Sequence, residues 1–210
     1  MSNHQQGQSL IETIMALFVL VTGLAAGLSL AIYVFGSSSD VSRRILATNL
    51  AREGIEAARR LRDSNWIAGT LIDCGSGQFC YSSWLTAPYN ISPSGGTGTE
   101  YRMLFDPSSM GNKWSLSPSG AGSDYRLYVQ AGGGLGHTAT TNPTQFFRKI
   151  SMVTVQSSAP YTATSPKVLV RSSVWWWDKK CPQITYLNPD GGNSHCKIVT
   201  EEFLTNWRNY

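Results

Sequence analysis

Glu12 is the residue that bears most directly on chemistry, because it is a carboxylate at the start of a strongly apolar segment. From Ile14 to Phe35 the chain has no charged residue and no proline. A carboxylate at the end of such a segment is costly in a membrane, and it usually has a function and a partner. A cut after Gly7 would create that partner, since it would leave a new α-amino group on Gln8. Residues 8 and 12 are i and i+4, so the amine and the carboxylate would share one face of a helix.

The four cysteines form two pairs that are local in the sequence. Five residues separate Cys74 from Cys80, and fourteen separate Cys181 from Cys196. Neither spacing is that of a zinc ribbon, so we expect disulfides 74–80 and 181–196 and an oxidising compartment. Other pairings, and a zinc site built from all four thiolates, remain alternatives. A disulfide that closes a loop of about 15 residues contributes about 3 kcal/mol in the chain-entropy model.

The remaining polar residues do not form a recognisable catalytic pattern. His4, His137 and His195 are few and scattered, and there is no nucleophile elbow, paired-carboxylate motif or nucleotide loop. The glycine-rich run 132–136 has no Lys and no helix after it, which predicts a turn. We therefore expect no enzymatic activity, no cofactor and no metal.

The apolar segment is long enough to cross a membrane. As a helix its 22 residues span roughly 33 Å, about the thickness of the hydrocarbon core. It is longer than the apolar region of a signal peptide, and no small-residue cleavage site follows promptly. Gly23, Gly27 and Ala31 recur at four-residue steps, and small residues on one face favour close helix packing in membranes.

Beyond the apolar segment, Val41 to Trp66 predicts an amphipathic helix. We interpret the polar break Gly36–Asp40 as a kink or fray, so that one helix runs from about Gln8 to Asn65. The apolar stripe consists of Leu46, Leu50, Gly54, Ala57, Ala58 and Leu61. Three oppositely charged i,i+4 pairs are expected on its polar side: Arg52/Glu56, Glu56/Arg60 and Arg59/Asp63.

After a loop region rich in Gly, Ser, Thr and Pro, Ile67 to Glu100, the hydrophobic period changes to two. The segments with this period, each predicted as a strand, are Tyr101–Phe105, Tyr125–Ala131, Phe147–Gln156, Lys167–Trp177 and Lys197–Thr205. A helix followed by consecutive strands predicts the α+β class, with an antiparallel sheet packed on the amphipathic helix. Trp175 and Trp177 should face one way and Trp176 the other. We expect one of these faces to pack on Leu46, Leu50 and Leu61 in the core. The alternative is that the tryptophans form a surface that contacts another molecule.

The segment Gly7-Gln8-Ser9-Leu10-Ile11-Glu12 resembles the type IV prepilin signature. In that family a prepilin peptidase cuts after the glycine and methylates the new N-terminus, and the glutamate pairs with the N-terminal amine of its own or a neighbouring subunit. Carried over here, the resemblance implies a cut between Gly7 and Gln8 and an assembly role for Leu10, Ile11 and Glu12. The resemblance also implies that Gly23 and Gly27 pack against neighbouring helices in a filament core.

The resemblance extends to most of the chain. The run 52–59 is similar to the corresponding helix of minor pilins and pseudopilins, and 147–150, 167–175 and 204–207 are similar to strands of their sheet. It implies five regions: a leader 1–7, a membrane or filament-core helix 8–36, an amphipathic half 37–66, a loop region 67–100 and a sheet domain 101–210. The chain departs from the family pattern in three places. Gln8 replaces the frequent Phe, the leader has no Lys or Arg, and Ser29 stands where a helix-bending Pro is common.

From these observations we expect a structural subunit, of the minor class, of a type IV pilus-like filament. Its partners would be other pilin subunits, the prepilin peptidase and the inner-membrane assembly platform. We expect a single-pass membrane precursor with an extracytoplasmic C-terminal domain, although Arg43 and Arg44 beyond the apolar run favour the opposite orientation under the positive-inside rule. The alternatives are a pseudopilin of a secretion system and an uncleaved membrane-anchored binding domain. Nucleic-acid binding by the helix arginines is not favoured, because they have acidic neighbours.

Overall fold

One long helix, α1 (Gln5–Ala68), begins the fold and belongs to both units into which the chain divides, residues 1–45 and residues 46–210. It continues through Gly36–Asp40, so the expectation that this polar break does not end the helix is confirmed. The computed structural model describes residues 5–68, 71–73, 79–81, 84–85, 91–106, 108, 114–119, 124–131, 133–162, 165–179, 181 and 194–206. Side chains are described from Leu10 onward within α1.

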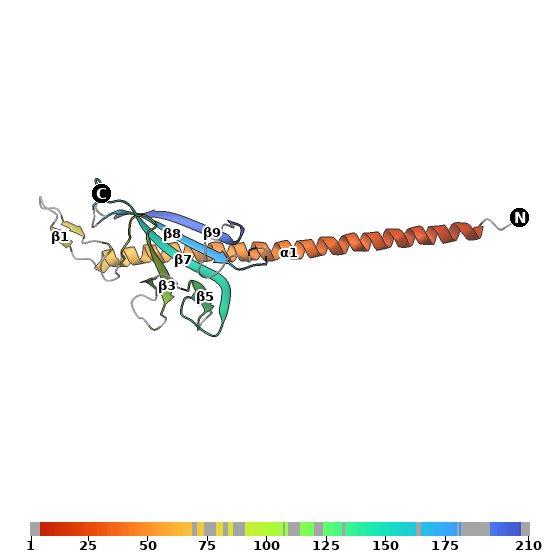
Figure 1. Ribbon diagram of the computed structural model, residues 1–210, viewed down its shortest axis with the longest axis horizontal. Coiled ribbons are helices and arrows are strands. Elements are labelled where there is room, and N and C mark those ends of the chain that lie inside the picture. The colour runs from red at the N-terminus through yellow and green to blue at the C-terminus, as the bar shows by residue number, and fades with distance from the viewer. Residues whose placement is uncertain are drawn as a thin grey trace. The chain divides into compact units, whose positions relative to one another are not determined.

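The strands follow the helix in the chain (Figure 1). Their bounds are β1 Leu71–Asp73, β2 Phe79–Tyr81, β3 Thr99–Phe105, β4 Trp114–Pro118, β5 Arg126–Val129, β6 Leu135–Gly136, β7 Pro143–Gln156, β8 Lys167–Trp176 and β9 Lys197–Leu204. A short 3-10 helix, η1 (Ser194–Cys196), precedes β9. The long apolar helix and the antiparallel sheet together make an α+β fold, as predicted.

The main sheet has seven strands, and every pairing in it is antiparallel. Its centre is β7, which pairs along one side with β8 and along the other with β3 and then β5. Strands β4 and β6 extend β3 and β5, and β9 extends β8. β1 and β2 form a separate hairpin. Because β7 is 14 residues long, one strand can hold two shorter neighbours end to end on the same side.

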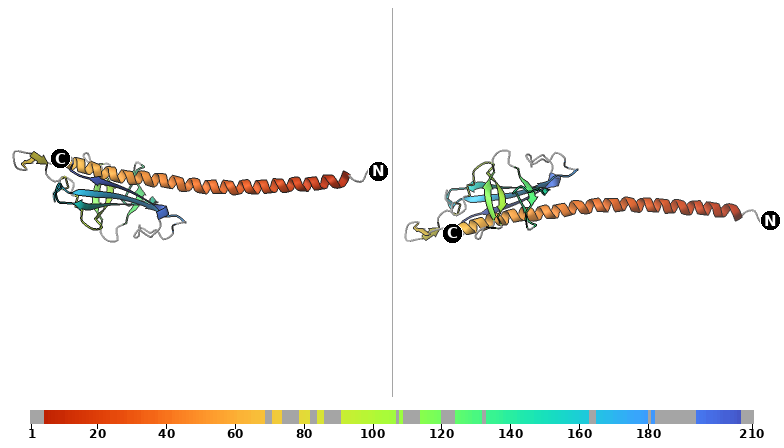
Figure 2. Two further views of the ribbon diagram at one scale, coloured as in Figure 1. Left: turned by 90° about the horizontal axis from the view of Figure 1, so that it is seen from above. Right: turned by 90° about the horizontal axis from the view of Figure 1, so that it is seen from below.

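One face of the sheet packs on the second half of α1, which lies along one side of the sheet in both views of Figure 2. The closest approach is at Gly54, where an added Cβ would lie 3.1 Å from Cβ of Ser172 and 3.4 Å from Cδ1 of Ile150. Ile150 pairs with Ser172 across β7 and β8, so these two residues define the helix-facing side of the sheet. Side chains alternate along each strand, so Phe147, Lys149 and Trp175 lie on the opposite, outer face.

The core consists of two clusters along α1. The first joins the helix, from Ile55 to Trp66, to β3, β7 and β8, and it includes Tyr101, Met103 and Met152. The second begins about two turns earlier, at Ala47, and includes Leu50 with aromatic residues of β7 and β8. The predicted stripe is buried from Leu50 to Leu61, whereas Leu46 is 40% exposed and lies at its edge. Ala47, Ala51 and Ile55 are also buried.

The five predicted strands all exist, with ends shifted by up to four residues. Strands β1, β2, β4 and β6 were not predicted, and of these β4 has Trp114 and Leu116 partly buried against the first cluster. The alternation covers only a few residues, which is too short for a clear period of two. β1 and β2 lie in the segment 67–100 that was predicted as a loop region. The turn predicted at 132–136 is the β5–β6 hairpin, in which Gly133 has a φ of +86° that favours glycine.

Candidate functional site

The first half of α1 exposes its apolar side chains on all sides. Among the described residues this is the single helix long and apolar enough to cross a membrane by length and composition. The exposed fractions run from 53% at Val34 to 75% at Tyr33 and Phe35. A monomeric protein in water rarely exposes such a surface, and a helix that is apolar all round is normally buried in lipid or in other helices. The segment is therefore compatible with a single-pass membrane anchor.

The hydroxyl groups in this segment are satisfied within the helix itself. Thr13 Oγ1 donates to the carbonyl of Leu10 at 2.9 Å, Thr22 Oγ1 to that of Phe18 at 2.9 Å, and Ser29 Oγ to that of Ala25 at 2.9 Å. Such bonds lower the cost of placing these side chains in an apolar environment. An ionised carboxylate has no proton to donate, so Glu12 cannot be satisfied in this way.

Glu12 lies on the exposed surface of α1, next to Leu10 and Ile11, which are 61% and 65% exposed. The helical backbone includes Gly7 and Gln8, whose side chains lie outside the described residues. Residue 8 and Glu12 therefore lie one helical turn apart on the same face. If the helix began at residue 8, Glu12 would be close to its first turn, where free backbone N–H groups and the helix dipole favour negative charge.

Gly23 and Gly27 leave open space on the helix surface. A Cβ built at either position would have no neighbouring atom within 4 Å. At Gly54, by contrast, the sheet fills that space. Glycines one turn apart allow a second helix to approach closely, which is the expected role of Gly23 and Gly27.

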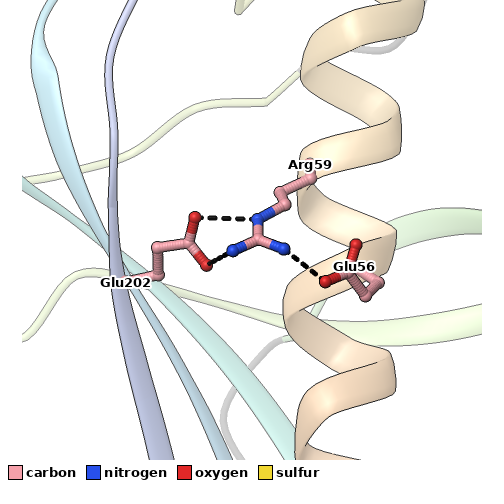
Figure 3. Close-up of polar contacts among 3 residues, drawn as sticks. All are labelled: Glu56, Arg59 and Glu202. Carbon is pink, nitrogen blue, oxygen red and sulfur yellow. Dashed lines mark hydrogen bonds and ion pairs between the residues drawn. The ribbon is translucent and has the colours of Figure 1, made fainter.

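Arg59 links the second half of α1 to strand β9 (Figure 3). Its Nε donates to Glu202 Oε1 at 2.7 Å and its Nη2 to Glu202 Oε2 at 2.5 Å, while Nη1 donates to Glu56. The bond with Glu202 is the main reason that the pKa of Arg59 is raised. The predicted pair Arg59/Asp63 is wrong, because Arg59 turns toward β9 and Asp63 instead accepts from Arg62.

A second arginine joins the sheet to α1 in the interior. Arg148 of β7 is fully buried, and its Nη1 donates to Glu53 Oε2 at 2.7 Å and to the carbonyl of Leu50 at 3.3 Å. Burial lowers the pKa of Arg148, and the Glu53 carboxylate opposes that effect. Sequence reasoning missed this pair, because nothing in the spacing of Glu53 and Arg148 marks them as neighbours.

His137 is inserted where β3 and β5 separate along β7. Its Nδ1 lies 2.9 Å from the carbonyl oxygen of Met103, and its Nε2 lies 2.8 Å from that of Arg148. Burial, and then the Arg148 charge, lower the pKa of His137 to about 4, while the two carbonyls act in the opposite direction. A neutral imidazole can donate only one of the two bonds. His137 thus has a structural position between two strands.

The three tryptophans differ in their surroundings. Trp176 lies on the helix-facing side with Leu50 in the second cluster, and Trp175 is stacked on Phe147 on the outer face, with ring centroids 5.8 Å apart. Trp177 is 50% exposed. Leu61 packs in the first cluster, so the expectation that it shares one face with Leu46 and Leu50 against these tryptophans is wrong.

The predicted disulfide between Cys181 and Cys196 is present, and both residues are buried next to the aromatic residues of the second cluster. It connects the end of β8 to η1 and so holds the start of β9. Cys74 and the Cys80 side chain lie outside the described residues, so disulfide 74–80 stays a prediction.

No protein-family model, no curated protein and no solved structure matches this chain. The assignment of a function therefore depends on the residues and geometry described above.

Proposed function

We propose that this chain is a structural subunit, of the minor class, of a type IV pilus-like filament, and that a prepilin peptidase cuts it after Gly7. The observation that carries the proposal is the exposed apolar helix with Glu12 one turn from residue 8. Such a helix needs an apolar environment both before and after assembly. A membrane provides the first, and the helices of neighbouring subunits provide the second.

In this proposal the carboxylate of Glu12 sets the register in which one subunit packs against its neighbours. Cleavage gives residue 8 an α-amino group, and a charge pair between this amine and Glu12 is strong where water is excluded. A Glu12 left without a cation in a packed helical core is costly, so each subunit is stable only in the register that brings the two groups together. Gly23 and Gly27 then allow the close helix packing that such a register requires.

In this proposal the sheet domain is extracytoplasmic. The disulfide between Cys181 and Cys196 supports this orientation, because structural disulfides persist in oxidising compartments. The positive charges near the end of the apolar segment favour the opposite orientation, and one of them, Arg43, lies 3.5 Å from Asp40. The partners are other pilin subunits, the prepilin peptidase and an inner-membrane assembly platform.

Intact-mass measurement of the protein isolated from native membranes tests the cleavage. We expect a mature chain that begins at Gln8 and carries one methyl group. A mature chain that keeps residues 1–7 would contradict the proposal and would support an uncleaved membrane-anchored domain.

The Glu12→Ala variant tests the assembly step. We expect it to insert into the membrane in normal amounts but to be reduced at least about tenfold in filaments, since loss of a desolvated charge pair costs several kcal/mol. Thr13→Val is the matched control, because the Thr13 hydroxyl is already bonded within its own helix. If filaments contain as much Glu12→Ala as wild-type subunit, the proposed role of Glu12 is wrong.

A further inference from the structure

The outer face of the sheet carries a group of cations at the place where β3 and β5 meet along β7. Tyr101 pairs with Ile150, and Arg126 pairs with Phe147, so Arg102 and Arg126 flank Lys149 on the same side of β7. Tyr101 and Met103 are buried in the helix-facing core, which places Arg102 on the outer face. Arg126 lies there too, with its guanidinium 5.2 Å from the centre of the Phe147 ring. By the register at Tyr101, Arg102 lies opposite Lys149, two residues along β7 from the Phe147 that pairs with Arg126. Two residues along a strand span about 7 Å, within reach of two long side chains.

The lysine of this group is already neutralised. Lys149 Nζ lies 2.7 Å from Glu100 Oε1 and 5.9 Å from the centre of the Tyr125 ring. The Tyr125 hydroxyl donates to the other oxygen of Glu100. Burial, and then Glu100, raise the pKa of Tyr125 to about 12, so this tyrosine brings no negative charge at neutral pH. Glu100 is therefore fully engaged and is not available to the arginines.

The two arginines, by contrast, have donors without acceptors. The Nε atoms of Arg102 and Arg126 are buried and make no hydrogen bond, and within the described part of the chain neither guanidinium has an ion-pair partner. Asp124, two residues before Arg126, accepts from the Arg126 backbone N–H and from the Tyr128 hydroxyl. Buried donors of a charged group that lack an acceptor are unusual in a folded protein. Arg148 also has two such atoms, Nε and Nη2, but its charge is paired with Glu53.

We propose that Arg102 and Arg126 form a binding site for a phosphate group, carried by a phosphomonoester or by inorganic phosphate. Each guanidinium presents a planar fork that matches two oxygen atoms. A carboxylate has two oxygens, which one fork saturates, whereas a phosphate has at least three acceptor oxygens and can bridge two forks. This proposal is independent of filament assembly.

Titration calorimetry of the full-length protein in detergent, with inorganic phosphate at constant ionic strength, tests the site. We expect saturable binding of one phosphate per chain. The double variant Arg102→Gln and Arg126→Gln should bind at least about tenfold more weakly, since it loses the charge-assisted hydrogen bonds to the phosphate oxygens. The matched control is Arg171→Gln, on the same sheet face, whose guanidinium already pairs with Glu201.

Three results would overturn the proposal. One is wild-type protein that shows no saturable phosphate binding, a result that does not depend on any variant being folded. The second is equal loss of affinity in the double variant and in Arg171→Gln. The third is tight binding of single-stranded DNA that phosphate does not compete with, which would make the face a nucleic-acid surface instead. Circular dichroism of each variant shows that the fold is intact.

Discussion

Two arginines join α1 to the sheet through glutamates, and they differ mainly in burial. Arg148 is fully buried and bonded to Glu53 of α1, whereas the side chain of Arg59 is 39% exposed and bonded to Glu202 of β9. Solvent screens the second pair, so its geometry alone says little about its strength. The first pair holds a charge that the protein has removed from water, and removing its partner leaves that charge uncompensated.

The matched variants Glu53→Gln and Glu202→Gln test this difference. We expect Glu53→Gln to lower the free energy of unfolding by about 2–4 kcal/mol, because Arg148 would stay buried without a counter-charge. Glu202→Gln should cost less than about 1 kcal/mol, since its pair is partly solvated. Chemical denaturation of both variants checks the order, and equal losses would contradict it.

His137 should make the stability depend on pH. Its folded pKa of about 4 lies below the ordinary value of 6.5, so between these values the unfolded chain binds a proton that the folded chain does not. The free energy of unfolding should therefore decrease as the pH falls from 6.5 toward 4, by up to about 1.4 kcal/mol per pH unit from this residue.

The His137→Gln variant isolates that contribution, because glutamine can still donate to one carbonyl but does not titrate. Denaturation curves at pH 7, 6 and 5 should show a shallower dependence on pH for the variant than for the wild type. The charged groups that act on His137 are Arg148 of β7 and Arg102 of β3, and both keep their charge throughout this range. Identical slopes would mean that His137 does not carry the effect.

At the scale of elements, α1 is one helix with two different surroundings. Residues before Ile45 expose apolar side chains, whereas residues from Ala47 onward bury one stripe against the sheet. Small residues allow the second half of α1 to lie close to the sheet. At Gly54 the helix faces the Ser172–Ile150 pair, and an added methyl group would crowd it. The glycines in the two halves therefore have different roles: Gly54 admits the sheet of the same chain, and Gly23 and Gly27 leave the surface open.

Gly54→Ala should destabilise the sheet domain by about 1–3 kcal/mol, because the added methyl group overpacks the contact with Ser172 and outweighs the gain in helix propensity. Gly36→Ala is the control, since its added methyl group would meet no atom within 4 Å. Thermal unfolding followed by near-ultraviolet circular dichroism reports on the sheet domain. A Gly54→Ala variant as stable as Gly36→Ala would show that the contact can relax.

At the scale of the whole molecule, the sheet unit must be stable by itself, because the apolar half of α1 needs a membrane or other helices around it. The disulfide between Cys181 and Cys196 closes a segment with a sequence separation of 15 and anchors β9, whose partner among the described strands is β8. Replacing both cysteines by serine should lower the free energy of unfolding by about 3 kcal/mol. Denaturation of the wild type and of the double variant, both without reductant, checks this difference, and equal free energies of unfolding would contradict it.

The sequence by itself determined the long helix, its division into an apolar and an amphipathic half, five strands and the α+β class, and it favoured the disulfide 181–196 among several pairings. These features follow from periodicity, composition and spacing, which are local in the chain. The prepilin-like segment and Glu12 were also visible there, although their role stays a proposal.

Only the tertiary structure decided which charges meet. Arg59 and Glu202 are 143 positions apart and Arg148 and Glu53 are 95 apart, so helix spacing predicted local partners for Arg59 and none for Arg148. The insertion of His137 between two carbonyls, and the placement of Arg102 and Arg126 on one face of the sheet, depend on β7 holding β3 and β5 end to end. Strand pairing between distant segments sets these contacts, and a local pattern carries no information about it.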